Sequence, residues 1–439
     1  MKTKILLVVS MVAVGLLFLH NFAFAAEEIK IGVIQAQTGM YAGFGTGAVF
    51  GIKAAADDIN KLGGVDVGGE KMKVELVIVD NKSDPNNAGT MAQSLVTRDR
   101  VKFLLSGDEP PPMHPGVSMV AERYKIPYVT SVGPFEPWTA MRNETDTKWR
   151  YTWATGLFAI AVPASGDDFR AGKPGYTVND YWVDMLLKFK DKLGSKKVAV
   201  IASDEPDGVG WYSGLGQMLK PHGFKPIGLD KKLGLLPLET TDFSSVINKW
   251  KVSGTEVLWG NCPAPFFGAL WKQCQSLGFK PKVVFIGRAP LFYQDIISWG
   301  GDLPQGIGVE IWWDPTLTEY KGIGDTTPMS LVERWKQKTK QPMNPAIGPG
   351  YRAFQVLVDA ISRAGTLDSQ KVNAALAETD LMTIGHRVKF DENHFSRGPL
   401  FFGQWQKVDT PEKWKLEVIY SHHEFVSKTA EPLYPIPYK

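Results

Sequence analysis

The sequence predicts an α/β fold of two lobes, each built on a parallel sheet, and three observations predict it. Apolar runs typical of buried strands alternate with stretches of helical apolar spacing along most of the chain. These cycles form two tandem sets, separated by a segment rich in polar and aromatic residues at 138–171. Helices of this length between strands are typical of crossovers in parallel sheets that are buried on both faces.

The N-terminus predicts export. Lys2 and Lys4 precede an apolar run at 5–19, and residues 23–25 read Ala-Phe-Ala, the small-x-small pattern of a signal peptidase site. The run is shorter than the roughly 20 residues that a membrane-spanning helix needs. We therefore expect residues 1–25 to be a cleaved signal peptide and the mature protein to be periplasmic.

The first set of elements follows the predicted signal peptide. A glycine-rich loop is expected at 38–47, after the first strand. Strands are expected at 28–35, 72–79, 103–105 and 127–129, and helices at 48–62, 84–98 and 115–124. In the second of these helices Asp84 is the expected N-cap and Pro85 the first helical residue.

The second set follows the break, and a different pattern begins at Ile307. Helices are expected at 176–193, 211–222, 243–251 and 265–277, with strands at 197–201, 225–229, 256–259 and 282–286. Further helices are expected at 329–340, 349–364 and 369–379, before shorter strands that complete both lobes. Ligands of open α/β sheets bind beyond the carboxyl ends of the strands, so we expect the site in the loops that follow them.

Composition and cysteine placement exclude several classes of protein. With 49 basic and 46 acidic residues the net charge is +3, so we expect no nucleic-acid partner and no anionic membrane surface. Cys262 ends a strand-like run, whereas Cys274 lies well inside the helix expected at 265–277. Because that separation exceeds the reach of a disulfide, we expect two free, buried thiols.

Enzyme signatures are weak or absent in the sequence. Gly43, Gly45 and Ala48 fit G-x-G-x-x-A, and Asp80 ends the next strand, which imitates a dinucleotide-binding fingerprint. However, about seven residues separate the first strand from these glycines, whereas the fingerprint needs them directly at the turn. The sequence contains no G-x-S-x-G, no H-E-x-x-H and no phosphate-binding loop. We expect a protein that is not an enzyme and uses no cofactor and no metal.

Many positions along the mature chain match the pattern of a known family. They are Ile29-Lys30-Ile31-Gly32-Val33, Thr38-Gly39, Gly45, Gly51-Ile52-Lys53-Ala54-Ala55, Asp58-Ile59-Asn60, Gly63-Gly64-Val65, Asp80, Asp84-Pro85, Ile126-Pro127-Tyr128, Thr241-Asp242-Phe243-Ser244, Gln273, Gly278 and Phe279. Taken together, they resemble the type I periplasmic binding proteins of the leucine/isoleucine/valine-binding group, which supply ATP-driven importers.

The resemblance implies two Rossmann-like lobes joined by a three-segment hinge, which close on a ligand between them. By similarity, one lobe would hold residues 26–150 and 314–383, and the other would hold 151–313 and 384–439. The partners implied are a small-molecule ligand and the membrane permease subunits of an ABC importer. Whether residues 158–174 cover the cleft is left open.

The ligand loops depart from those of the amino-acid-binding members. The family places hydroxyl residues after the third and fourth strands and an acid in the far lobe. Here the loops read Gly-Asp-Glu-Pro-Pro-Pro at 107–112 and Ser-Val-Gly-Pro-Phe at 131–135, and Arg288 stands near the place of the acid. Arg288 could bind a ligand carboxylate through two parallel donors, or pair with a neighbouring acid of the protein.

We therefore expect an organic anion with an aromatic or apolar portion, oriented by Arg288 and loop amides. The candidate ligand-binding residues are Tyr41, Phe44, Asp108, Glu109, Ser131, Gly133, Phe135, Trp153, Trp211, Asn261, Arg288 and Trp312. Glu109 favours the opposite class, because an acid beside the cleft suits a cation or an amide. An amino-acid or amide binder, a protein that signals to a membrane sensor and a periplasmic hydrolase are the alternative functions.

Overall fold

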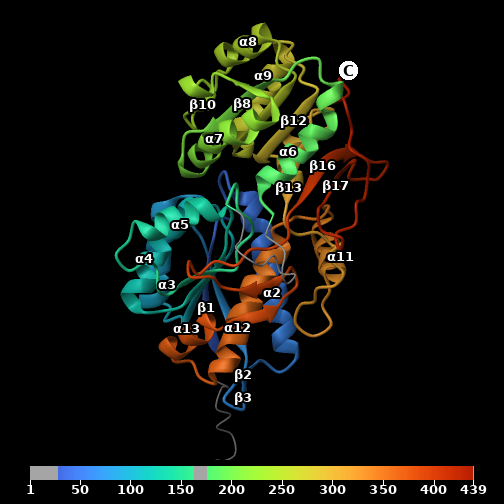
Figure 1. The fold of residues 1–439 in the computed structure, drawn as a ribbon. Helices are drawn as coiled ribbons and strands as arrows, with labels where there is room; N and C mark the ends of the chain where they lie inside the picture. Colours follow the sequence, from blue (N-terminus) through green and yellow to red (C-terminus); the bar gives the residue numbers. More distant parts are fainter. Residues whose placement is uncertain (1–27, 163–175, 439) are drawn as a thin grey trace, which may run out of the picture.

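The computed structural model describes residues 28–162 and 176–438. Two lobes lie one above the other, each built around one sheet (Figure 1). The predicted signal peptide and most of the segment at 158–174 lie outside the described residues. Within those residues, every helix is too short or too polar to cross a membrane.

The first sheet has five parallel strands in the order β4-β1-β5-β6-β7. They are β1 (Ile29–Gln35), β4 (Val74–Asp80), β5 (Phe103–Asp108), β6 (Tyr128–Ser131) and β7 (Thr152–Ala154). The helices of this lobe are α2 (Ala42–Lys61), α3 (Pro85–Thr97), α4 (His114–Tyr124), α5 (Phe135–Asn143), α11 (Pro328–Thr339), α12 (Ile347–Ala364) and α13 (Ser369–Ala377). Ile31 and Val33 pack with α2, whereas Ile34 and Leu104 pack with α3 and α4, so the sheet is buried on both faces.

The second sheet has eight strands, of which β10-β8-β11-β12-β13 run parallel and β16 and β17 complete it antiparallel. Its strands are β8 (Lys197–Ser203), β9 (Lys225–Ile227), β10 (Leu235–Leu236), β11 (Val257–Cys262), β12 (Val283–Arg288), β13 (Ile307–Ile311), β16 (Phe401–Lys407) and β17 (Trp414–Tyr420). Its helices are α6 (Val178–Phe189), α7 (Pro206–Leu219), α8 (Ser244–Ser253), α9 (Ala264–Ser276) and α10 (Tyr293–Trp299). The alternation predicted from the sequence is therefore present in both lobes.

Short elements fill the connections. Two small antiparallel pairs are formed by β2 (Val65–Val67) with β3 (Glu70–Met72) and by β14 (Asp380–Met382) with β15 (Arg387–Lys389). Single 3-10 turns are η1 (Pro111–Met113), η2 (Lys190–Lys192), η3 (Lys220–His222) and η4 (Leu229–Lys231). As expected, Asp84 caps α3 by accepting hydrogen bonds from the backbone N–H groups of Asn86 and Asn87, with Pro85 at the first position. Cys262 and Cys274 are free and buried, which confirms that prediction.

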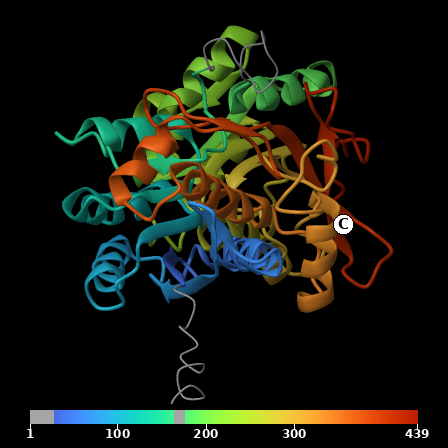
Figure 2. The ribbon, with the colours of Figure 1, turned by 90° about the horizontal axis from the view of Figure 1, so that it is seen from below.

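The chain returns to the first lobe after β13. Viewed along the long axis of the molecule, α12 lies beside α2, although some three hundred residues separate them in sequence (Figure 2). Gly51 makes this approach possible, because a Cβ atom there would lie 2.0 Å from the carbonyl oxygen of Ile347. The helix pair therefore packs backbone against backbone.

The prediction of a glycine-rich loop at 38–47 is wrong from Ala42 onward, because α2 begins there. These glycines serve close packing instead of chain reversal. A Cβ atom on Gly45 would lie 1.8 Å from the carbonyl oxygen of Ala36, at the end of β1. The absence of a side chain lets the first turn of the helix sit directly on the strand end.

The pairing of the strands leads us to propose other positions for two of the predicted lobe bounds. Thr152–Ala154 pairs with β6 and so belongs to the first sheet, although the prediction placed it after the crossing. The backbone N–H of Ala154 also donates to the carbonyl oxygen of His394, at 2.8 Å. We therefore propose that the first crossing follows Ala154 and that the last one lies between Ser396 and β16.

Candidate functional site

A cavity lies between the two lobes at the carboxyl ends of the strands. Its empty volume is about 340 Å³, including the part open to solvent. The first lobe lines it with Phe44, Asp108, Glu109, Pro110, Pro111, Gly133 and Pro134. The second lobe and the connecting segments line it with Leu157, Phe158, Asp207, Trp211, Arg288, Glu310 and Trp312.

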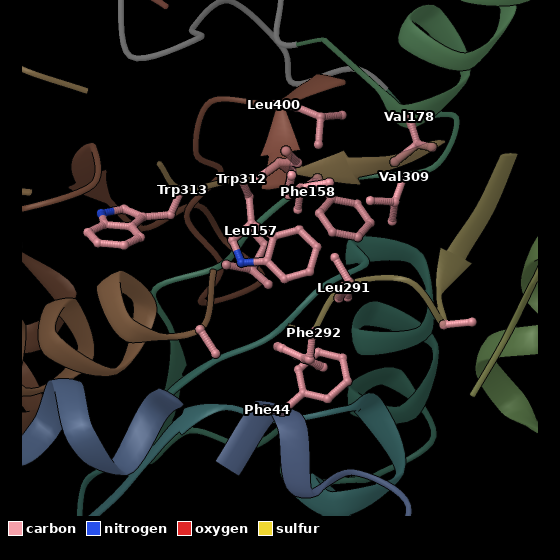
Figure 3. Packing of buried hydrophobic residues seen from close by; sticks show 14 of the residues in the cluster. Phe44, Leu157, Phe158, Val178, Leu291, Phe292, Val309, Trp312, Trp313 and Leu400 are labelled. Atoms are coloured by element: carbon pink, nitrogen blue, oxygen red, sulfur yellow. The ribbon is translucent and has the colours of Figure 1, made fainter. Parts of the chain in front are cut away.

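Aromatic rings meet in this cavity and beside it. Phe44 of α2 contacts Phe292, which precedes α10 in the other lobe, edge to face with ring centroids 4.6 Å apart. Phe158 and Trp312 lie beside each other with centroids 5.4 Å apart. Figure 3 shows both pairs, with Leu157 close to the second pair. The lobes are therefore in contact, and one side of the cavity is apolar and aromatic.

Arg288 stands at the end of β12 and is held by acids of its own lobe. Its Nη2 lies 2.6 Å from Glu205 Oε1, and its Nε lies 2.9 Å from Asp207 Oδ2. Nη2 also donates to Ser203 Oγ and Nε to Asn261 Oδ1, at 3.1 and 3.0 Å. Nη1 has no partner among the described residues. Of the two roles left open for Arg288, the structure shows the pairing with neighbouring acids.

Two acids that line the cavity share one arrangement. Glu109 Oε1 accepts hydrogen bonds from the backbone N–H of Ala36 and from Asn81 Nδ2, at 2.6 and 3.1 Å. Asp207 Oδ2 accepts from Asn261 Nδ2 at 3.1 Å, in addition to the pair with Arg288. Within the described part of the chain, the second oxygens of these two acids, Glu109 Oε2 and Asp207 Oδ1, have no hydrogen-bond partner, and neither do Glu310 Oε2 and Asp108 Oδ2.

Burial sets the protonation of these acids. It raises the pKa of Asp108 to about 8, against the opposing effects of the Arg352 charge and the Trp312 indole N–H. Burial likewise raises the pKa of Glu109 and of Glu310 to about 8. Burial raises the pKa of Asp207 to about 6. The rise is smaller than for the other three acids, because the charge of Arg288 opposes it. A carboxyl with no access to water favours its neutral form unless a donor or a cation faces it.

Seven of the twelve predicted residues line the cavity. They are Phe44, Asp108, Glu109, Gly133, Trp211, Arg288 and Trp312. Tyr41 lines a smaller adjoining cavity, together with Phe44 and Arg288. Asn261 lies behind the lining, where it joins Asp207 to Arg288. Ser131 accepts a hydrogen bond from Arg352 Nη2 at 2.9 Å.

Two predicted aromatic residues lie outside the cavity. Phe135 packs against Phe395, with ring centroids 5.3 Å apart, because α5 begins there and turns away from the cleft. Trp153 stacks on His394 at 3.6 Å, and its indole N–H donates to Asn373. Both rings therefore pack the region where residues 391–396 join the first lobe.

Asp207 and Glu310 were not predicted, although the sequence carries a signal for each. Glu310 is the one charged residue of the apolar strand β13, and a buried acid inside a strand is rare without a role. Asp207 follows the strand β8 and lies in the first turn of α7. Only the fold shows that both side chains reach the same cavity as Glu109.

Arg352 of α12 links the first lobe to the first connecting segment by hydrogen bonds. Its Nη2 donates to Ser131 Oγ in the first lobe and to the carbonyl oxygen of Gly156 in the first connecting segment, at 2.9 and 2.7 Å. Its Nε donates to Thr155 Oγ1 at 3.3 Å. Burial lowers the pKa of Arg352 to about 9, against the opposing effect of the Asp108 carboxylate.

Comparison with known proteins agrees with this architecture. The profile of a family described as periplasmic binding protein matches residues 28–410. A leucine-, isoleucine-, valine-, threonine- and alanine-binding protein of Pseudomonas aeruginosa is 25% identical over 381 residues, which cover 85% of this chain and 88% of that protein.

Solved structures show the same fold. A leucine-binding protein from Thermotoga maritima superposes with a TM-score of 0.69 at 19% identity, over 90% of this chain and 99% of that one. A solute-binding protein of Rhodopseudomonas palustris in complex with 3,4-dihydroxybenzoic acid gives 0.65 at 18%, over 92% and 99%. The chain belongs to the family of periplasmic binding proteins, as a type I member of the leucine/isoleucine/valine-binding group.

Proposed function

We propose that this protein is the substrate-binding component of an ABC importer. It is exported to the periplasm, captures a small organic ligand by closing its two lobes, and presents it unaltered to the membrane permease subunits. The observation that carries the proposal is the cavity lined by both lobes, with Phe44 and Phe292 joining the lobes beside it. A molecule that touches both lobes stabilises their contact and so shifts the hinge towards closure.

The lining supports a ligand with an aromatic or apolar body. Phe44, Phe158, Trp211 and Trp312 offer ring surfaces on several sides. Flat apolar walls with a few polar groups are typical of sites for compact organic molecules. The lobes leave little free space between them in this closed state, so a ring-sized ligand enters only when the lobes part, and a compact ligand needs the least opening.

An aromatic carboxylate is the second candidate. Arg288 Nη1 favours it, because this donor faces no protein acceptor, and so does the relative that binds 3,4-dihydroxybenzoic acid. The pairs that Arg288 forms with Glu205 and Asp207 weaken the case, since they already compensate its charge. Transmission of a signal to a membrane sensor uses the same closure and stays an alternative.

Calorimetric titration tests the proposed function. The panel contains aromatic carboxylates, aliphatic acids, amides, amines and amino acids, each also tested for its effect on the melting temperature. We expect tight one-to-one binding within one of these classes, lost in Phe44→Ala because the ligand loses its aromatic wall. Failure of every class to bind, or conversion of any compound to a product, contradicts the proposal.

A further inference from the structure

The polar half of the cavity is dominated by hydrogen-bond acceptors. Four acids line it, from both lobes: Asp108, Glu109, Asp207 and Glu310. Among the described residues, Arg288 is the single cationic residue of the lining, and it already lies within 2.9 Å of two carboxylates. If all four acids were ionised, the lining would carry a net negative charge, which Arg288 and the Arg352 charge that acts on Asp108 offset only in part.

The carboxylate oxygens that have no protein donor are buried and fixed in position. Glu109, Asp207 and Glu310 are each at most 2% exposed. Protein donors fix one oxygen of Glu109 and one of Asp207, which leaves the second oxygen of each without a protein partner. A buried acceptor without a donor costs about 1–3 kcal/mol, more if it is charged, so such a site favours a ligand that supplies donors.

We propose that the ligand carries a donor-rich, non-acidic head, an ammonium, amidinium or primary amide group, that bridges Glu109 of the first lobe to Asp207 and Glu310 of the second. This inference rests on the proposed function and names the ligand class of the same cavity. The apolar body of the ligand lies against Phe44, Trp211 and Trp312.

A carboxylate head meets the opposite environment. It would enter a cavity lined by four acids and gain Arg288 Nη1, the one unpaired cationic donor that the described residues place there. Where these acids are ionised, above the pKa of about 8 that burial gives Glu109 and Glu310, repulsion between like charges is large, because the effective dielectric constant of a buried cavity is low. The geometry thus discriminates by charge as well as by shape.

The same arrangement controls closure of the empty protein. Glu109 belongs to one lobe, and Asp207 and Glu310 belong to the other, so closing the cleft buries their charges together. A ligand with donors compensates these charges, whereas an empty cleft leaves them exposed to each other. Closure without ligand is therefore opposed while the acids are ionised.

Acid pH removes that opposition. The pKa of Glu109 and of Glu310 is about 8 in the closed state, whereas in an open, hydrated cleft it lies near the ordinary value. Between these values the closed state binds more protons, so rising pH shifts the hinge towards the open state. The other charged or titratable groups that act on these acids are Tyr41, Asp80, Asp108, Glu136, Glu205, Asp207, Arg288 and Arg352.

Matched probes test the class of the head group. Benzylamine, benzamidine, benzamide and benzoate share one ring, and isobutylamine, isobutyramide and isobutyrate form the aliphatic set. We expect at least one donor-bearing probe to bind tenfold or more tightly than its matched acid in calorimetry. Tighter binding of the acids overturns the inference and leaves the proposed function standing. Binding by no probe of either set also overturns the inference, and the proposed function falls only if the wider panel fails too.

Variants test the residues. Glu109→Gln retains an oxygen for the N–H of Ala36 but presents an amide to the cavity, and Glu310→Gln is the second variant in case the first misfolds. We expect each to weaken the best donor-bearing probe tenfold or more and to leave the weak binding of its matched acid equal or stronger. Glu70→Gln, an exposed change in β3, is the control. Equal loss for both probes would show a merely structural role and overturn the inference.

Scattering of the ligand-free protein tests closure without any probe. We expect the radius of gyration to fall as the pH is lowered from 8.5 to 5.5, and we expect Glu109→Gln to reduce that change. The Glu70→Gln control should follow the wild type. A radius of gyration that does not depend on pH contradicts the charge-controlled closure.

Discussion

Arg288 organises the second lobe's side of the cavity. Its backbone is in the left-handed region, with φ of 63°, at the point where β12 ends. This conformation directs the chain away from the sheet while the guanidinium stays among Ser203, Glu205, Asp207 and Asn261. Because every one of these groups is buried or nearly so, their charges depend on each other.

Replacement of Arg288 should destabilise the fold. In Arg288→Met, Glu205 and Asp207 lose their counter-charge inside the protein, and removing one partner of a buried pair costs about 3–5 kcal/mol. Urea denaturation measures the change. The exposed pair of Lys30 with Glu75 gives the control, since Lys30→Met should cost at most about 1 kcal/mol. Equal costs for the two variants would contradict the account of the network.

At the residue scale the sequence predicts part of the site. Asp108, Glu109 and Gly133 were predicted from the loops that follow β5 and β6, and they line the cavity. Such loops can be located because the apolar strand before each one is visible in the sequence. The partners of Arg288 could not be predicted in the same way. Glu205 and Asp207 follow β8, more than eighty residues earlier, and only strand order brings β8, β11 and β12 together.

Among the elements, α2 brings the first lobe to the cleft. Its first turn carries Phe44, and Gly43 lies beside the ring of Phe292 from the other lobe. A Cβ atom on Gly43 would lie 2.2 Å from Phe292 Cδ2. The helix can therefore approach the second lobe only while this position has no side chain.

Gly43→Val should hinder closure without unfolding either lobe. The added side chain collides with Phe292 in the closed state but meets solvent once the lobes part. We expect affinity for the best ligand of the panel to fall tenfold or more in calorimetry, with the melting temperature of the ligand-free protein little changed. Gly210→Ala in α7 is the control, because the nearest atom to its Cβ would be 4.0 Å away. Unchanged affinity in Gly43→Val would contradict the closed arrangement.

Two connecting segments cross at Gly156, which has a φ of 52°. A Cβ atom there would lie 1.6 Å from the carbonyl oxygen of Ser396. Gly254 has a similar φ of 67°, but a Cβ atom there would meet nothing within 4 Å. A side chain at Gly254 would therefore meet only backbone strain, whereas a side chain at Gly156 would meet both backbone strain and a collision at the hinge.

Alanine at these two positions should have unequal effects. Gly254→Ala carries only the strain of a left-handed residue, about 1–2 kcal/mol. Gly156→Ala adds the collision with Ser396, so we expect a larger loss of stability in urea denaturation and a changed hinge equilibrium in scattering. Equal losses would show that the segments do not cross as tightly as described.

Element bounds were predictable where local signals were strong. The helix at 265–277 and its neighbouring strands follow from apolar spacing and from turn residues. The pairing of Thr152–Ala154 with the first sheet could not be predicted, because a three-residue strand is too short to show a periodic pattern. The start of α2 was missed for the opposite reason, since its glycines are typical of loops and only tertiary packing explains them.

At the scale of the whole molecule, the two lobes form one device for enclosing a small molecule. Each sheet directs its strand ends towards the cavity, and the hinge residues Arg352 and Gly156 hold the lobes in register on one side of it. The family resemblance predicted two lobes that enclose a ligand, whereas the sequence alone could not show that Asp207 and Glu310 join Asp108 and Glu109 in one cavity. Four acids from both lobes converge there, and that convergence is a property of the closed fold.

The central claim is that closure traps an unaltered compound. Small-angle scattering with and without a saturating amount of the tightest panel ligand, followed by mass spectrometry of the released compound, tests it directly. The account predicts a smaller radius of gyration in the complex and a recovered compound of unchanged mass. A radius that stays the same at saturation, or a recovered compound of altered mass, would contradict it.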